Sequence, residues 1–372
     1  MTRGEADRSR YGRRRSHTNF GRFPASDPTY IGQTTRSYLD ARPRAMTTTV
    51  TSVPETSFAE YEDLKSILDA GSRRMTIEIV GEVHAEGRRF AVHVATLGST
   101  DPLAPTIGLF AGIHGLERIG TQLVLDYMRV LLCRLEWDEL LYTQLQRIRF
   151  VFMPIVNPGG MWAMRRSNPN GVDLMRNAPH NAEGRVPFLA GGQRIGPWLP
   201  WYRGRGGAPM ELEAALMLRV VEEQLLSRPL SFALDCHSGY GFRDSIWFPY
   251  AKSTRHIEHL PEMFALKGML EGAHPHHRYL FEPQSLQYLS HGDLWDYAYD
   301  RARAPAIFLP LTLELGSWLW IRKNPLQVLK REGIFNPVKA HRTERVLRRH
   351  TDLLDFLARA AYAAPGWLPQ GA

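Results

Sequence analysis

The sequence of 372 residues contains only two cysteines, Cys133 and Cys236. Two thiols cannot form the dense disulfide framework of a small secreted scaffold, and nothing else in the composition indicates an oxidising compartment. A long apolar run is also missing, because the longest one, 306–320, is interrupted by Pro310 and Glu314 and is too short to cross a bilayer. With 44% hydrophobic and 23% charged residues, the composition is that of an ordinary globular chain. We therefore expect a soluble, cytoplasmic protein with no membrane partner.

Positive charge is concentrated in the first 46 residues. This segment has ten Arg, no Lys and four acidic residues, so it carries +6 of the net charge of +8 and leaves +2 for the rest. The remainder is nearly neutral, and we expect no nucleic-acid partner for the folded domain. The segment has no apolar core of a secretory signal, and its acidic residues are unusual in a transit peptide. We predict a disordered, Arg-rich leader at 1–46, or alternatively a basic arm that contacts polyanions, and a single catalytic domain at 47–372.

Hydrophobic periodicity predicts strands that alternate with helices. The strands are expected at 75–80, 89–95, 105–111, 148–156, 230–236 and 306–315, and the helices at 58–70, 117–135, 210–226, 257–272, 292–301 and 338–362. This alternation favours an α/β fold with a mixed, largely parallel central β-sheet and helices on both faces. The long irregular stretch 157–209 is typical of a functional or mobile segment.

Polar residues lie at the ends of four of the predicted buried strands. They are His114, Asn157, His237 and Glu314. In open α/β sheets, ligands bind where strands end in loops. We therefore expect the chemistry of this protein to lie at these strand ends.

His114 and Glu117 could together ligate a metal ion, since two such residues three apart in a turn can offer one nitrogen and one carboxylate oxygen. The spacing alone is weak evidence, because His180/Glu183, His259/Glu262 and His341/Glu344 repeat it. The first pair differs in its setting, since it lies in a glycine-flanked turn between an apolar strand and a helix.

His237 and Glu314 each allow two interpretations. His237 ends a strand and precedes small residues, so it is either a ligand or a satisfied core histidine. Glu314 lies in an apolar strand, where a carboxylate is costly to bury unless it is paired, metal-bound or catalytic. Desolvation would raise its pKa and suit a general base, whereas an arginine partner would make it a structural ion pair.

The irregular stretch 157–209 has three arginines, Arg165, Arg166 and Arg176, within a dozen residues. A loop of this composition either binds an anion such as a carboxylate or is a basic surface loop.

These motifs, in their order, resemble the M14 zinc metallocarboxypeptidases. The resemblance covers roughly residues 75–320 and consists of the motifs H-x-x-E at 114–117, N-P-x-G at 157–160, R-x-N-x-x-G-x-D-L-x-R-N at 166–177, the lone His237 and E-L-G at 314–316. It implies a zinc carboxypeptidase-like phosphorylase/hydrolase-type fold. It further implies one zinc ion per chain bound by His114, Glu117 and His237, with Glu314 as the catalytic base.

The same resemblance assigns further roles to polar and aromatic residues. Arg166 would polarise the scissile carbonyl, and Asp173 would orient His114. Arg176 would bind the terminal carboxylate of the substrate, although the usual asparagine beside it is Met175, which cannot donate a hydrogen bond. The resemblance also suggests Tyr288 as a substrate-covering side chain, with Tyr279 and Tyr299 as alternatives, and Trp295 as part of an apolar specificity pocket.

The expected activity is therefore hydrolysis of amide bonds, with release of C-terminal residues from a peptide substrate. The alternative is a zinc amidase or deacylase that acts on acylated amino acids or cell-wall peptides. A non-catalytic peptide-binding protein is a further alternative, against which the presence of all four proposed zinc and base residues speaks. The loop His274-Pro275-His276-His277 could be a second metal site, but its composition favours a surface loop.

Overall fold

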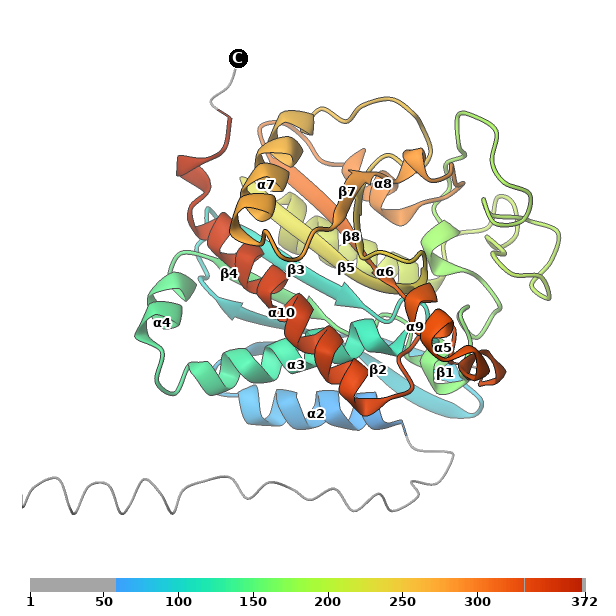
Figure 1. The fold of residues 1–372 in the computed structure, drawn as a ribbon, viewed down its shortest axis with the longest axis horizontal. Helices are drawn as coiled ribbons and strands as arrows, with labels where there is room; N and C mark the ends of the chain where they lie inside the picture. The colour runs from blue at the N-terminus through green and yellow to red at the C-terminus, as the bar shows by residue number, and fades with distance from the viewer. Residues whose placement is uncertain (1–57, 331, 370–372) are drawn as a thin grey trace, which may run out of the picture. The chain divides into compact units, whose positions relative to one another are not determined.

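One mixed sheet of eight strands organises the part of the chain that the computed structural model describes, residues 58–330 and 332–369 (Figure 1). The strand order is β1–β2–β4–β3–β5–β8–β6–β7. The strands are β1 (Thr76–Ala85), β2 (Arg88–Gly98), β3 (Thr106–Ala111), β4 (Arg149–Met153), β5 (Leu230–Tyr240), β6 (Ser245–Phe248), β7 (Leu280–Pro283) and β8 (Ile307–Gly316). The predicted leader, 1–46, lies outside the described residues.

Parallel pairing dominates the centre of the sheet. The pairs β3–β4, β3–β5, β5–β8 and β6–β7 are parallel, whereas β1–β2, β2–β4 and β6–β8 are antiparallel. Strands β3 and β8 are almost continuously buried, as is β5 up to its last two residues, which is the pattern of strands covered on both faces. The predicted mixed, largely parallel sheet is confirmed.

Helices cover both faces of this sheet (Figure 1). They are α2 (Ala59–Gly71), α3 (Arg118–Arg134), α4 (Glu139–Leu145), α5 (Pro158–Trp162), α6 (Leu212–Val221), α7 (Leu260–Ala273), α8 (Leu294–Tyr299), α9 (Trp318–Lys323) and α10 (Ala340–Tyr362). Short turns of 3-10 helix lie at Leu174–Arg176, Gln284–Leu286, Pro325–Leu329 and Ala364–Gly366, and a π-helical turn at Glu222–Leu226. Helices α3 and α10 pack against each other and against β3 and β5, and α2 packs on α3. On the part of the chain described, no helix combines the length and apolar character needed to cross a membrane.

Helix α3 shows why these sequences form these elements. Its buried residues include Leu123, Val124, Tyr127, Met128 and Leu131, whose three- and four-residue spacing gives one apolar face. That face lies on the central strands. The first turn of α3 approaches β5 so closely that a Cβ at Gly120 would stand 2.2 Å from the carbonyl oxygen of Cys236. A glycine is therefore required beside the strand that carries His237.

The turn that contains His114 is held by hydrogen bonds of Asn157 and by close backbone packing at Gly115. Asn157, which follows β4, donates from Nδ2 to the carbonyl oxygen of Ile113 (3.1 Å) and accepts from the backbone N–H of Gly160 (2.8 Å). A Cβ at Gly115 would stand 2.2 Å from the backbone of Gly160. The loops after β3 and β4 are therefore packed backbone to backbone, which fixes the position of His114.

Candidate active site

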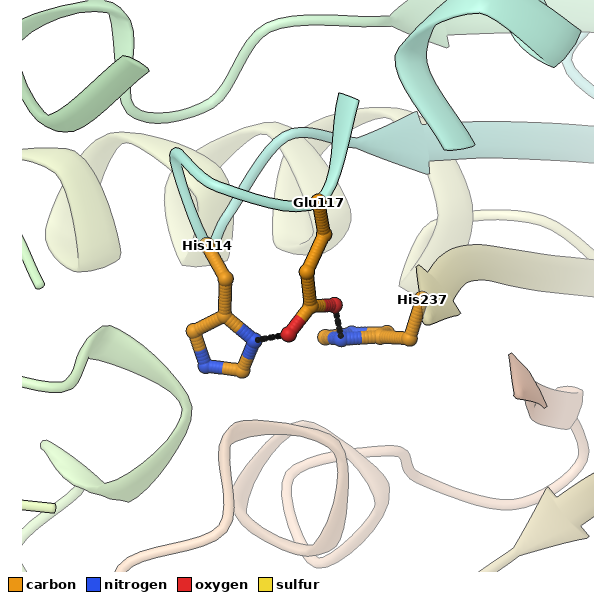
Figure 2. A group of neighbouring side chains, drawn as sticks. All are labelled: His114, Glu117 and His237. Atoms are coloured by element: carbon orange, nitrogen blue, oxygen red, sulfur yellow. Dashed lines mark hydrogen bonds and ion pairs between the residues drawn. The ribbon is translucent and has the colours of Figure 1, made fainter. Parts of the chain in front are cut away.

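His114, Glu117 and His237 converge in a buried cluster (Figure 2). His114 follows β3, Glu117 is the N-cap residue just before α3, and His237 lies near the carboxyl end of β5. His114 Nδ1 lies 2.9 Å from Glu117 Oε1, and His237 Nδ1 lies 3.0 Å from Glu117 Oε2. One ligand-type atom from each residue lies within 4.8 Å of the others. The structure therefore brings together the three residues that the sequence suggested as metal ligands.

The outward-facing nitrogen of each histidine is held by a carboxylate. His114 Nε2 lies 3.1 Å from Asp173 Oδ1, and His237 Nε2 lies 2.7 Å from Asp235 Oδ2. The indole N–H of Trp295 donates to the same Asp235 oxygen (3.0 Å). Such partners fix the ring orientation and tautomer of metal-binding histidines. Asp173 thus occupies the orienting position expected for it.

The electrostatics of the cluster favour a positive charge at its centre. The buried Nδ1 of His114 has no hydrogen-bond partner, although it points toward Glu117. Burial alone would raise the pKa of Glu117, but His114, His237 and Arg166 hold it well below its usual value. Burial alone would lower the pKa of His237, but Asp235 and Glu117 raise it well above its usual value. Two imidazoles and a carboxylate of this kind are a donor set that suits zinc.

Glu314 lies beside His237, because the two residues are register partners on the parallel strands β5 and β8. The backbone N–H of Tyr240 donates to Glu314 Oε1 (2.9 Å). Burial, and then the negative charge of Glu117, raise the pKa of Glu314 to about 8. In the described part of the chain, Glu314 forms no ion pair with an arginine. The alternative in which Glu314 is a structural ion-pair partner is therefore not supported.

Arg166 reaches the metal cluster from the irregular segment. Its Nη1 lies 2.7 Å from Glu117 Oε1, and its Nε lies 3.2 Å from Asp173 Oδ2. Desolvation would lower the pKa of Arg166, but Asp173 and Glu117 outweigh it and raise the pKa further. The guanidinium is therefore a fixed positive charge at the edge of the site.

The Arg176 side chain already bonds other groups of the protein, which the resemblance did not lead us to expect. Its Nε donates to the carbonyl oxygen of Ala190 (3.1 Å), and its Nη1 lies 3.2 Å from Asp173 Oδ2. Met175 lines the same cavity. A carboxylate that entered here would meet one arginine with two of its nitrogens already bonded, and a thioether that donates nothing.

These residues surround a cavity of about 770 Å³. Its lining includes the polar residues His114, Glu117, Arg166, Arg176, His237, Asp293 and Glu314, together with the aromatic residues Trp201, Tyr240, Trp247, Tyr288, Trp318 and Phe335. Tyr288 packs against Tyr240 and Trp247, with ring centroids 6.0 Å and 6.4 Å apart. Tyr279 and Tyr299 lie outside the lining, where they bond His350 and His259. Tyr288 is thus the one of the three tyrosines that the structure places at the cavity.

Trp295 is not part of the cavity wall. It is buried, its ring lies against Phe110, and its indole N–H, the polar group of the side chain, donates to Asp235. The expected contact between Trp295 and a substrate side chain is not supported by this position. Trp295 instead bonds Asp235, which in turn bonds His237.

Sequence reasoning missed Asp235, although a signal was present. Asp235 and His237 lie two apart on a strand, and the period of two places them on the same side of the sheet. The hydrogen bond from the Tyr240 backbone to Glu314 was also missed. That bond arises where the register between β5 and β8 shifts after Ser238, which no side-chain pattern indicates.

The sequence model of the zinc carboxypeptidase family matches residues 61–318, most of the part of the chain that contains the sheet and the site. The chain belongs to the zinc carboxypeptidase family. It is accordingly a metallopeptidase-type hydrolase, and its His114/Glu117/His237 cluster is the candidate metal site.

Solved structures agree on the fold. The chain is similar to carboxypeptidase A from Helicoverpa armigera at 18% identity and a TM-score of 0.62, over 81% of this chain and 72% of that one. It is similar to the bovine thrombin-activatable fibrinolysis inhibitor, in complex with tick carboxypeptidase inhibitor, at 17% identity and a TM-score of 0.57, over 82% of this chain and 94% of that one. At these identities the likeness concerns the arrangement of the sheet and helices alone.

Proposed function

We propose that this protein is a zinc metallocarboxypeptidase that releases C-terminal residues from peptides. The observation that carries the proposal is the convergence, in one cavity, of His114, Glu117 and His237 with a buried Glu314 and a fixed Arg166. The three ligand residues would hold one zinc ion and leave a coordination position open, as catalytic rather than structural sites do. Membership of the zinc carboxypeptidase family supports the choice of metal.

Zinc bound there would act as a Lewis acid and lower the pKa of water toward neutrality. Glu314 would accept a proton from the attacking water and pass it to the leaving nitrogen. Arg166 would stabilise the negative charge that develops on the scissile carbonyl oxygen. Tyr288, on the cavity wall, would cover the substrate and exclude bulk water from the reacting bond.

The carboxylate end of the substrate would lie at Arg176. This is the weakest part of the match to an exopeptidase, because Arg176 already bonds Asp173 and Ala190 and Met175 supplies no donor. The same observation favours a second candidate, an amidase or deacylase acting on acylated amino acids or cell-wall peptides. Such substrates would use the metal cluster and Glu314 in the same way but would not need a strong carboxylate clamp.

Peptide trimming separates the two candidates. The zinc-loaded protein is incubated with a mixed peptide library and with a panel of N-acyl amino acids, and the products are identified by mass spectrometry. Glu314→Gln is the blank. Loss of single C-terminal residues with the unaltered protein alone would establish a carboxypeptidase. Cleavage of the acyl amino acids without peptide trimming would establish the amidase instead.

A further inference from the structure

A second cavity, of about 690 Å³, lies apart from the metal cluster, and six cationic side chains are among its lining residues. Its positively charged residues are Arg243, Arg278, Lys323, Arg342, Arg345 and Arg349, and Asp244 is the one carboxylate among the lining residues. They come from the loops before β6 and β7, the end of α9 and the first half of α10. We refer to this feature as the basic cavity.

Most of these cationic side chains form no ion pair with a carboxylate of the described part of the chain. Among the described residues, no ion pair is found for Arg243, Arg278, Lys323 or Arg345. Arg349 lies 3.4 Å from Asp244 Oδ2. An accumulation of like charge around a concave surface is unfavourable by itself, and a bound anion relieves it.

The single carboxylate does not cancel this charge for an incoming ligand, because its own oxygens are taken up by the protein. Asp244 Oδ1 accepts a hydrogen bond from the backbone N–H of Gly316 (3.0 Å). Asp244 Oδ2 faces Arg349 and the Nε2 atoms of His277 (3.4 Å) and His350 (3.6 Å). The carboxylate thus ties the loop before β6 to the end of β8 and to α10.

Three of the arginines that line the basic cavity are positioned by helix α10. Arg342, Arg345 and Arg349 lie at three- and four-residue spacing on α10, so they share one face of that helix. His350, the residue after Arg349, also lines the cavity; it is buried and bonded through Nδ1 to the hydroxyl of Tyr279 (2.9 Å). The cavity lies near the start of this 23-residue helix, whose amino end adds partial positive charge.

His277, His350 and Asp244 also satisfy the spacing of a metal site. A divalent cation is nevertheless disfavoured here, because six permanently charged cations line the same cavity and would repel it. The positive charge of the side chains that line the basic cavity favours binding of an anion instead.

We propose that the basic cavity binds a small multivalent anion of the oligophosphate class, either an inorganic oligophosphate or the phosphate chain of a nucleotide. Arginine forks bind phosphate oxygens in bidentate geometry, and several of them are available around one concave surface. This site is independent of the peptidase reaction. It nevertheless shares a wall with the active-site cavity, because Phe242 lines the basic cavity, Trp318 lines the active-site cavity, and their rings lie 5.5 Å apart.

Calorimetric titration of the zinc-loaded, full-length protein with tripolyphosphate tests the proposal. The decisive variant is Arg278→Glu with Arg345→Glu, chosen because both side chains are exposed and neither forms an ion pair with any residue of 58–330 or 332–369. The matched control is Arg73→Glu with Arg89→Glu, which makes the same charge change at exposed positions next to β1 and in β2, at the opposite edge of the sheet from β6 and β7. We expect one binding site per chain, weakened about tenfold or more in the first variant and unchanged in the control.

Three results would overturn the proposal. They are the absence of saturable binding, equal weakening by the control, and binding that survives Arg278→Glu/Arg345→Glu but is lost in Arg166→Ala, which would place the anion in the active-site cavity. Titration with ATP separates the two sources of phosphate. Equal affinity for ATP and tripolyphosphate assigns the cavity to the phosphates alone, whereas tighter binding of ATP assigns it to a nucleotide.

Discussion

The described part of the chain contains two groups of two histidines and one carboxylate, and their surroundings differ in charge. In the group of His114, Glu117 and His237, carboxylates hold the outward-facing ring nitrogens of both histidines, and a single arginine bonds Glu117. His277, His350 and Asp244 are surrounded by arginines. Both groups meet the same distance criterion for a metal site.

The two clusters share the spacing of their ligand atoms but differ in their surroundings, and we expect the surroundings to decide what each binds. In the first cluster, the carboxylates raise the pKa of His237 well above its usual value despite its burial. In the second, burial outweighs the charge of Asp244 and lowers the pKa of His350 to about 4. One environment favours added positive charge and the other resists it.

The largest expected effect is that of Glu314→Gln. If Glu314 is the proton acceptor, this substitution lowers kcat by about three orders of magnitude or more, because general-base catalysis and the charge of the carboxylate are both lost. Zinc content should be unchanged, since Glu314 is not one of the three ligands. The measurement is turnover on the best substrate together with metal analysis of the same preparation, and loss of zinc from this variant would show that Glu314 is a ligand.

Arg166→Ala is expected to cost about 100- to 1000-fold in kcat, since a fixed charge near the developing oxyanion is lost. Arg165→Ala is the matched control, because Arg165 is the neighbouring residue but is exposed and does not line the cavity. Steady-state kinetics of both variants make the comparison. Near-normal kcat in Arg166→Ala would remove this arginine from the reaction.

Trp295→Phe tests the support behind the metal cluster. An aromatic ring is kept, but the pyrrole part of the indole and its hydrogen bond to Asp235 are lost, and zinc affinity is expected to fall about tenfold. Competition with a zinc chelator measures this affinity, and the thermal stability of the metal-free protein shows whether packing has changed. Trp137→Phe, at an exposed site, is the control. An unchanged zinc affinity in Trp295→Phe would mean that Asp235 positions His237 without the indole.

The smallest effect concerns His350 in the basic cavity. The pKa of His350 is about 4 in the folded protein, whereas its ordinary pKa is 6.5. Between these two pH values the unfolded chain binds a proton at this histidine and the folded protein does not. Stability is therefore lost as the pH falls from about 6.5 toward 4, by about 1–2 kcal/mol between pH 7 and pH 5 from this group. Urea unfolding at the two pH values should show a smaller pH dependence in His350→Gln and an unchanged one in the control His84→Gln, at an exposed position of β1. An equal pH dependence in His350→Gln and the unaltered protein would contradict this account.

The central sheet could be predicted from the sequence because β3, β5 and β8 are largely apolar runs with polar residues at their ends. His114, His237 and Glu314 were expected at strand ends, and they do lie there. The short strands β6 and β7 and helices α4, α5 and α9 were not predicted, since four to seven residues give too little periodicity to detect. Helix α6 ends at Val221, where the predicted helix continues as a π-helical turn.

The contacts between distant segments were harder to predict. Trp295 was expected at the substrate, but α8 places it behind β5, against Asp235. The histidine-rich loop at 274–277 was expected to be a surface loop. Its last histidine lies beside Asp244 and His350, and His350 comes from a helix more than 70 residues later. Neighbours of this kind depend on how helices pack on the sheet, which the local sequence pattern does not specify.

The number of zinc ions per chain tests the central claim most directly. Native mass spectrometry of the zinc-loaded protein should show one zinc ion in the unaltered chain, one in His350→Gln and none in His237→Gln. Two zinc ions in the unaltered chain, with one lost in His350→Gln, would contradict the account, as would full retention of zinc by His237→Gln.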